Sequence, residues 1–167
     1  MTPLASSVDS ATGSTDICNL WKEHYEALLN SVDCHGEKHN VLKKLNVSSE
    51  HVPRISASII CEKVKELKHG KAKGHDGLQA EHLTYSSPKL FAFLSMLFNS
   101  IIVHSYLPEA IMHTIIIPII KDSKGDVTSK DNYRPIANTT IFLKLFEIIL
   151  LSMYKQNLST TDNQIWI

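Results

Sequence analysis

The sequence predicts a mostly helical α+β domain that contains one small β-hairpin. At 167 residues, with 43% hydrophobic and 20% charged residues, the chain is long enough to form its own core. A β-branched run at 113–120 and a second short run at 133–136 are separated by a charged loop, which is typical of a hairpin. Apolar residues recur every three or four positions, as in helices that bury one face, in four segments: 16–32, 56–67, 88–102 and 141–154.

The first part of the chain is expected to lie outside the compact domain. Residues 1–15 are small and polar, so they are expected to form a disordered tail. Residues 16–54 are expected to be a helical connector and linker, beginning with an amphipathic helix that Thr15 or Asp16 caps and continuing as a polar loop. The compact part then covers residues 55–167.

Two further helices have clear start signals. Ser56 is a suitable cap for the helix at 56–67, which is expected to end at residues 68–70, where cationic side chains precede a glycine. Ser87 followed by Pro88 is a cap with proline at the first helical position. The helix that follows is apolar almost all round, so it is expected to be largely buried.

A glycine-rich turn at residues 70–77 separates these helices. Gly74 and Gly77 permit a positive φ, and Asp76 can cap a short helix with Gln79 in the reciprocal position. Lys71 and Lys73 lie in the same turn and could hold a phosphate at a helix N-terminus. The alternative is a turn without a ligand, since the segment lacks the lysine and hydroxyl ending of a P-loop.

Composition excludes several classes of function. Seventeen basic residues balance 17 acidic ones, so no global positive field indicates nucleic-acid binding. Cys18, Cys34 and Cys61 are widely spaced and match no zinc motif, and His35 and His39 have no third ligand at a useful spacing. No cofactor or metal is therefore expected.

The same composition bears on location. The N-terminal residues lack a secretory signal, and the longest apolar runs are shorter than the roughly 18 residues that a membrane span requires. An intracellular protein, cytoplasmic or nuclear and not bound to membranes, is expected.

Five short motifs follow one another along the chain. They are Gly70-Lys-Ala-Lys-Gly-His-Asp-Gly77, Ser105-Tyr-Leu-Pro108, Ile117-Pro-Ile-Ile-Lys121, Asn132-Tyr-Arg-Pro-Ile136 and Lys144-Leu-Phe-Glu147. In this order they resemble the start of the reverse transcriptase domain of non-LTR (LINE-type) retrotransposons, a class of transposable element. The resemblance covers roughly residues 55–164, and it implies that residues 55–167 are a partial reverse transcriptase domain, the fingers without the palm, after a helical connector.

The chain departs from this family in ways that bear on activity. Lys73, His75, Ser105 and Ile111 stand where the family commonly has proline, proline, glycine and tryptophan. The family's catalytic carboxylates lie in a hydrophobic-Asp segment and a Tyr-x-Asp-Asp turn, and neither is present. RNA-directed DNA polymerase activity is therefore not expected from this chain alone, and we assign no catalytic residue. A complete family member would use magnesium.

The densest set of acidic residues that could substitute for these carboxylates lies in the charged loop. Asp122, Asp126 and Asp131 are interleaved with lysines between the two predicted strands. A metal site needs rigid, convergent ligands, so a solvated charged loop is expected here instead.

The resemblance implies that phosphate contacts would fall on Lys121 and Arg134. A guanidinium makes bidentate phosphate contacts and an ammonium supplies a mobile point charge. Lys124 in the loop, with Lys71 and Lys73, completes the candidate basic set for RNA or DNA. The alternative for Arg134 is a structural ion pair with an acidic neighbour such as Asp131.

Three functions remain open. The chain could be a fragment with weak nucleic-acid binding. It could also be a small helical module that recruits a protein partner, or a second copy of itself, through the apolar helix at 141–154, which carries more apolar surface than one helix face needs. The third possibility is a non-functional transposon relic.

Overall fold

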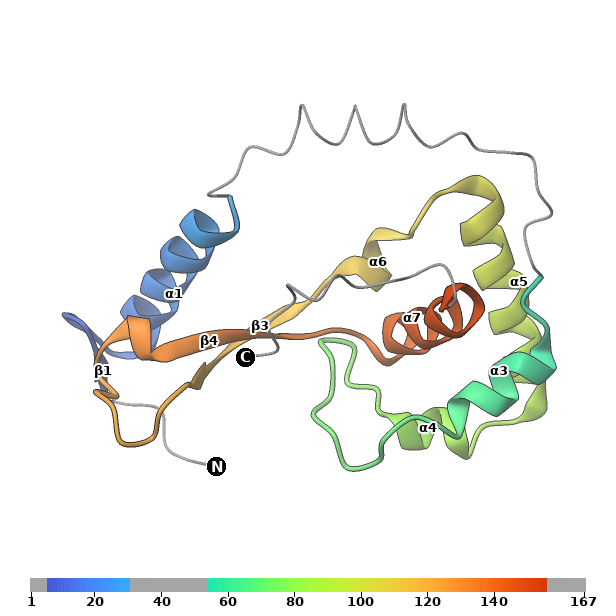
Figure 1. Cartoon of the computed structure of the whole chain (residues 1–167), viewed down its shortest axis with the longest axis horizontal. Helices are drawn as coiled ribbons and strands as arrows, with labels where there is room; N and C mark the ends of the chain where they lie inside the picture. Colours follow the sequence, from blue (N-terminus) through green and yellow to red (C-terminus); the bar gives the residue numbers. More distant parts are fainter. Residues whose placement is uncertain (1–5, 31–53, 156–167) are drawn as a thin grey trace. The chain divides into compact units, whose positions relative to one another are not determined.

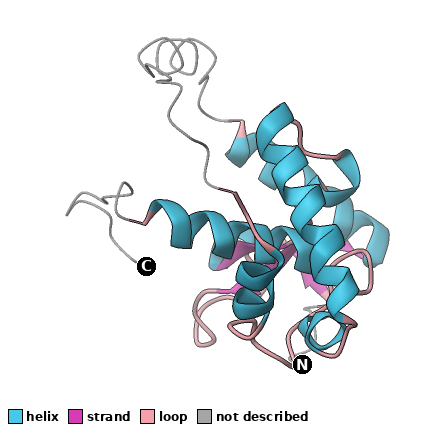
Figure 2. Ribbon diagram, turned by 90° about the vertical axis from the view of Figure 1, so that its right-hand side faces the viewer, coloured by secondary structure: helices cyan, strands magenta, loops and turns pink. Residues whose placement is uncertain are grey.

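The computed structural model describes residues 6–30 and 54–155. Helices make up most of this part, accompanied by two two-stranded sheets (Figure 2), which confirms the predicted α+β class. Contacts divide the chain into unit 1, Met1–Glu50 with Ile116–Ile136, and unit 2, His51–Ile115 with Ala137–Ile167. The predicted loop after the first helix, with Cys34, His35 and His39, lies outside the described residues.

Unit 1 begins with a short hairpin within the segment expected to be a disordered tail. Strand β1 (Ser7–Val8) pairs antiparallel with β2 (Ala11–Thr12). Asp9 in the turn has a φ of 47°, a left-handed conformation that Asp tolerates better than most residues. The Val8 side chain is fully buried, so even this small polar segment contributes one core residue.

Asp9 connects this hairpin to the loop between the later strands. Its backbone N–H donates to the Thr128 carbonyl at 2.6 Å, and the Lys130 N–H donates to its Oδ1 at 3.2 Å. The Lys130 ammonium lies 3.1 Å from Oδ2, and its hydrogen bond is the main cause that lowers the pKa of Asp9. Long-range polar contacts thus order a segment that its composition predicts to be disordered.

Helix α1 (Ser14–Leu29) packs on this hairpin. Its N-cap is Gly13, with no side-chain cap, so the prediction that Thr15 or Asp16 caps the helix is wrong. Gly13 has a φ of 85°, which lets the chain turn out of β2 directly into the helix. Asp16 instead lies in the first turn, where a negative charge favours the helix dipole.

An aromatic cluster forms the core of unit 1. The Trp21 ring stacks on Tyr25 at 5.4 Å between centroids and meets the Tyr133 ring at 4.9 Å. Val8 also belongs to the cluster, and the half-buried Ile17, Leu20 and Ile120 pack against it. The Tyr25 hydroxyl and Trp21 Nε1 are buried without a hydrogen-bond partner among the described residues, and burial raises the pKa of Tyr25.

The predicted hairpin at 113–136 is confirmed. Strand β3 (Ile115–Ile120) pairs with β4 (Tyr133–Asn138), which is longer than the run at 133–136 indicates. A short 3₁₀ turn, η1 (Lys130–Asn132), precedes β4. Tyr133 anchors this hairpin in the aromatic cluster, and its hydroxyl donates to the Val127 carbonyl at 2.8 Å.

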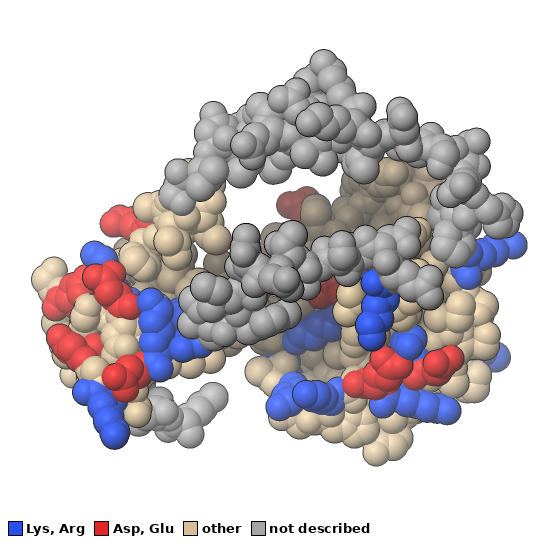
Figure 3. Space-filling model, viewed as in Figure 1, with Lys and Arg blue, Asp and Glu red and all other residues tan. Residues whose placement is uncertain are grey.

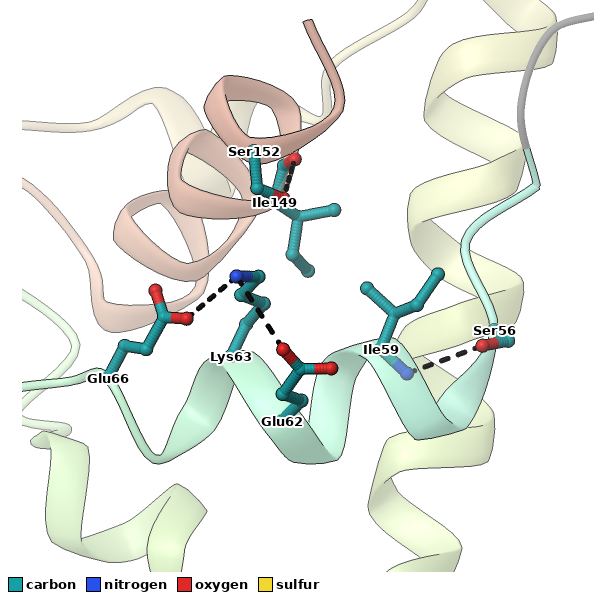
Figure 4. A network of polar contacts seen from close by, with 7 residues as sticks. All are labelled: Ser56, Ile59, Glu62, Lys63, Glu66, Ile149 and Ser152. Atoms are coloured by element: carbon teal, nitrogen blue, oxygen red, sulfur yellow. Dashed lines mark hydrogen bonds and ion pairs between the residues drawn. The ribbon is translucent and has the colours of Figure 1, made fainter. Parts of the chain in front are cut away.

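Unit 2 is helical. Its elements are α3 (Ala57–Val64), α4 (Ala80–Thr84), α5 (Pro88–His104), α6 (Glu109–Met112) and α7 (Ile141–Tyr154), labelled in Figure 1. Both predicted serine caps are confirmed: Ser56 accepts from the Ile59 N–H at 3.3 Å (Figure 4), and Ser87 from the Lys89 N–H at 3.4 Å. Helix α3 ends at Val64, earlier than the apolar pattern indicates, and α7 has the predicted bounds.

Helix α3 lies against both α5 and α7 and builds the core of unit 2. The Phe98 and Phe146 rings meet at 4.9 Å. The prediction that α5 is largely buried is wrong for one face, where Phe93 and Met96 are each 67% exposed and Val103 is 72% exposed. Only one side of α5 meets other described helices, and an apolar pattern all round a helix does not show which side will be covered.

Candidate functional site

The loop after β3 is built around the Asn132 side chain. Its Oδ1 accepts from the Asp122 N–H at 3.1 Å, while its Nδ2 donates to the Asp122 and Asp126 carbonyls at 2.9 and 3.2 Å. A Cβ on Gly125 would lie 3.0 Å from that same Nδ2. The charged loop expected from the sequence is therefore a tightly hydrogen-bonded turn, which fixes where the adjacent basic residues stand.

Lys121 directly follows β3, beside this turn. Its N–H donates to the Asn132 carbonyl at 2.8 Å, which continues the hairpin by one hydrogen bond. Its exposed ammonium donates to the Asp131 carbonyl at 2.9 Å. That acceptor is neutral, so no described carboxylate compensates the positive charge.

Arg134 lies on the other strand of the same hairpin. Neighbouring strand residues face opposite sides of a sheet. Ile120 and Tyr133 both face the aromatic cluster, so Lys121 and Arg134, each one residue further along, belong to the opposite face of the hairpin. Among the described residues no carboxylate forms an ion pair with Arg134, and the alternative of a pair with Asp131 is not observed there.

Two of the loop carboxylates accept hydrogen bonds from groups within the same turn. Asp122 Oδ1 accepts from the Lys124 N–H at 2.9 Å, while Asp126 Oδ1 accepts from the Thr128 N–H and hydroxyl at 2.8 and 2.6 Å. The Thr128 hydroxyl is the main cause that lowers the pKa of Asp126. Within the described ranges no group of three or more His, Cys, Asp or Glu is placed to hold a metal ion.

Lys71 and Lys73 belong to unit 2, in the glycine-rich turn. The Gln79 Nε2 donates to the Lys71 carbonyl at 2.9 Å, and the Asn138 Nδ2 donates to the Lys73 carbonyl at 2.6 Å. Both lysine side chains are exposed. The backbone of this turn is therefore used structurally, and it connects α4 to the segment that enters α7.

The residues of this turn have different roles from those expected. Gln79, not Asp76, is the N-cap of α4, and Asp76 Oδ1 instead accepts from the Leu78 N–H at 3.1 Å. Gly77 has the expected positive φ, 73°. Gly74 has no positive φ, but a Cβ there would lie 3.0 Å from the Thr139 carbonyl and 3.1 Å from Thr140 Cα. Close approach of backbone, rather than torsion, favours glycine at position 74.

Sequence reasoning missed the polar contacts at the start of α7. The half-buried Lys144 ammonium donates to Asn138 Oδ1 at 2.9 Å, and Asn138 is itself buried. Thr140 caps α7 by accepting from the Leu143 N–H at 3.3 Å. The lysine four residues after a capping threonine is the only local signal for this arrangement.

No family model matches the chain. None of the helices in residues 6–30 and 54–155 has the length and apolar character that crossing a membrane requires.

Proposed function

We propose that this chain is the connector and fingers portion of a reverse transcriptase of the non-LTR retrotransposon kind, and that its own activity is weak binding of RNA or DNA. The order and spacing of the five sequence motifs support this proposal. The basic hairpin of unit 1 is where the nucleic acid would bind.

The single observation that carries the binding proposal is the placement of Lys121 and Arg134 on one face of this hairpin. Neither has a carboxylate partner in the described part of the chain, so both charges are available to phosphate oxygens. Lys124, exposed in the adjoining loop, adds a third positive charge. Phosphate contacts of this kind give affinity without sequence specificity.

The surroundings of this face explain why binding would be weak. Acidic and basic side chains are interleaved over the loop region of unit 1 (Figure 3), where Asp122, Asp126 and Asp131 alternate with the lysines. Lys130 is neutralised by Asp9 at 3.1 Å. The local excess of positive charge is therefore small, so few phosphate contacts can form and affinity should fall only moderately with salt.

We propose no polymerisation by this chain alone. The hydrophobic-Asp and Tyr-x-Asp-Asp segments that carry the family's catalytic aspartates do not occur in the sequence. Any contribution to catalysis would need those carboxylates from another polypeptide or segment, together with magnesium.

A binding titration with a matched control tests the proposal. The full chain is titrated with a fluorescent single-stranded RNA, and the double variant K121A/R134A is compared with R54A/K89A, which removes one arginine and one lysine that are exposed in unit 2. We expect K121A/R134A to weaken binding about tenfold, through the loss of two phosphate contacts, and the control to bind like the wild type. Equal weakening by both variants would overturn the assignment of the hairpin face.

A further inference from the structure

A groove of about 840 Å³ opens in unit 2 between α7 and the chain that runs from the end of α3 to the start of α4. Its lining is mostly apolar and includes Leu67, Leu78, Ile141, Ile148, Leu150 and Leu151. Leu151 is 56% exposed, so this surface is covered incompletely. The volume lies in the range of pockets that bind ligands or anchor side chains of a partner.

Positive charge dominates the rim of this groove. Lys68, Lys71 and Lys144 line it. In the described part of the chain none of the three forms an ion pair, and the acceptor of Lys144 is the neutral Asn138 amide.

The acidic side chains of the rim offset this charge only in part. Glu66 and Glu147 also line the groove. Glu66 forms an ion pair with Lys63, in which the Lys63 ammonium lies 2.7 Å from Glu66 Oε1 (Figure 4). Glu147 is then the one rim carboxylate without an ion pair among the described residues. A partner that carries acidic groups beside apolar ones would therefore fit this groove.

The walls of the groove indicate the form of that partner. The lining residues lie on helices and a turn, and none belongs to a described strand. An extended peptide that adds to a sheet edge has no edge to pair with here, whereas a helix can place apolar side chains into such a groove at spacings of three and four residues. The mostly apolar lining also disfavours a nucleic acid, whose phosphates would need polar contacts.

We infer that this groove is a docking site for an amphipathic helix of a protein partner, with apolar anchors on one face and flanking Asp or Glu side chains that pair with Lys68, Lys71 and Lys144. The site lies in unit 2 and does not use Lys121, Lys124 or Arg134. Although it shares Lys71 with the candidate basic set, it does not depend on the basic hairpin that carries the nucleic-acid proposal.

A pair of synthetic peptides tests this inference on the full chain. Both peptides are helical, about four turns long, and share the same Leu pattern, but one carries Glu and the other Lys on the flanks. We expect the acidic peptide to bind with a Kd on the order of 10 µM, and at least about tenfold more tightly than the basic one at low salt. K68E/K71E should reverse this preference.

Two single variants distinguish specific binding in the groove from nonspecific hydrophobic binding. Leu151→Asn removes an exposed apolar contact of the groove and should weaken the acidic peptide about tenfold. Phe93→Asn removes a similarly exposed apolar side chain on α5, outside the groove, and should leave binding unchanged. Three results would each overturn the inference. The two peptides could bind equally, or the two variants could have equal effects. The chain could also self-associate with rising concentration, be relieved of this by Leu151→Asn, and bind no peptide. K121A/R134A should not affect this assay, so failure here and failure of nucleic-acid binding are distinguishable.

Discussion

Asn99 on α5 binds both backbone groups of Ile55. Its Oδ1 accepts from the Ile55 N–H at 3.0 Å, and its Nδ2 donates to the Ile55 carbonyl at 2.7 Å. The Ser95 hydroxyl donates to the same carbonyl at 2.7 Å. Ile55 is fully buried and directly precedes the Ser56 cap, so this contact places the start of α3 against α5.

Replacing this amide should destabilise unit 2. Asn99→Ala leaves the Ile55 N–H without its partner, while the carbonyl keeps the Ser95 hydroxyl, so we expect a loss of about 2 kcal/mol in the free energy of unfolding. Urea denaturation followed by circular dichroism measures it. Ser100→Ala, an exposed change at the next position, is the control, and identical midpoints for the two variants would show that the Asn99 contact is not stabilising.

Two tyrosines of the same cluster should respond in opposite directions to loss of their hydroxyl groups. Tyr25→Phe removes a buried hydroxyl that has no partner, so stability should stay unchanged or rise by up to about 1 kcal/mol. Tyr133→Phe removes the hydrogen bond to the Val127 carbonyl and should cost about 1 kcal/mol. Thermal melts of both variants measure these changes in stability. If Tyr25→Phe destabilises the protein as much as Tyr133→Phe or more, the result contradicts the structure.

Acid should weaken unit 1 through Asp9. The hydrogen bond from Lys130 lowers the pKa of Asp9 below its ordinary value of 3.8. A lowered carboxyl pKa contributes stability at pH values above about 3.8, and that contribution is lost as the pH falls through the lower, folded-state value. Asp9→Asn should therefore remove part of the acid dependence of unit 1.

The fluorescence of Trp21 reports this transition, in a Trp166→Phe background that leaves one tryptophan. The matched control is Lys130→Met, which removes the ammonium that pairs with Asp9. When Lys130 is already replaced by Met, Asp9→Asn should have no further effect on the acid transition. An effect of the same size with and without Lys130 would show that the ion pair does not cause the shift.

Gly74 should not tolerate a side chain. In Gly74→Ala the new methyl group would meet the backbone of Thr139 and Thr140, which cannot move as a flexible side chain would, so we expect a loss of about 1–3 kcal/mol. Gly77→Ala has open space but a φ of 73°, and should cost about 1–2 kcal/mol from torsional strain alone. Replacing Thr139 does not remove its carbonyl, so Thr139→Ala should not rescue Gly74→Ala, and rescue would contradict the backbone clash.

Local signals predicted the elements of this fold well. Caps such as Ser56 and Ser87, and the apolar spacing of α7, act within a few residues and need no knowledge of the rest of the chain. The hairpin of β3 and β4 likewise follows from two apolar runs separated by one loop.

Contacts between distant positions could not be predicted. Asp9 and Lys130 meet across 121 residues, and Ile55 and Asn99 across 44, without any pattern that links them. The first of these pairs joins the hairpin at residues 7–12 to the loop before β4. The need for glycine at position 74 arises from the backbone at Thr139, so only the folded chain reveals it.

For the candidate site, the sequence supplied the residues but not their environment. Only the resemblance points to Lys121 and Arg134. Their common face follows from the burial of Ile120 and Tyr133, and the roles of the loop aspartates follow from turn hydrogen bonds that no spacing rule indicates.

The salt dependence of RNA binding tests the central proposal most directly. The logarithm of the association constant falls linearly with the logarithm of salt concentration, by about 0.7 per phosphate contact on a single strand. If Lys121 and Arg134 each neutralise one phosphate, K121A/R134A should reduce that slope by about 1.4 relative to the wild type, while R54A/K89A leaves it unchanged. A slope that K121A/R134A does not alter, or that both variants alter equally, would contradict binding through this face of the hairpin.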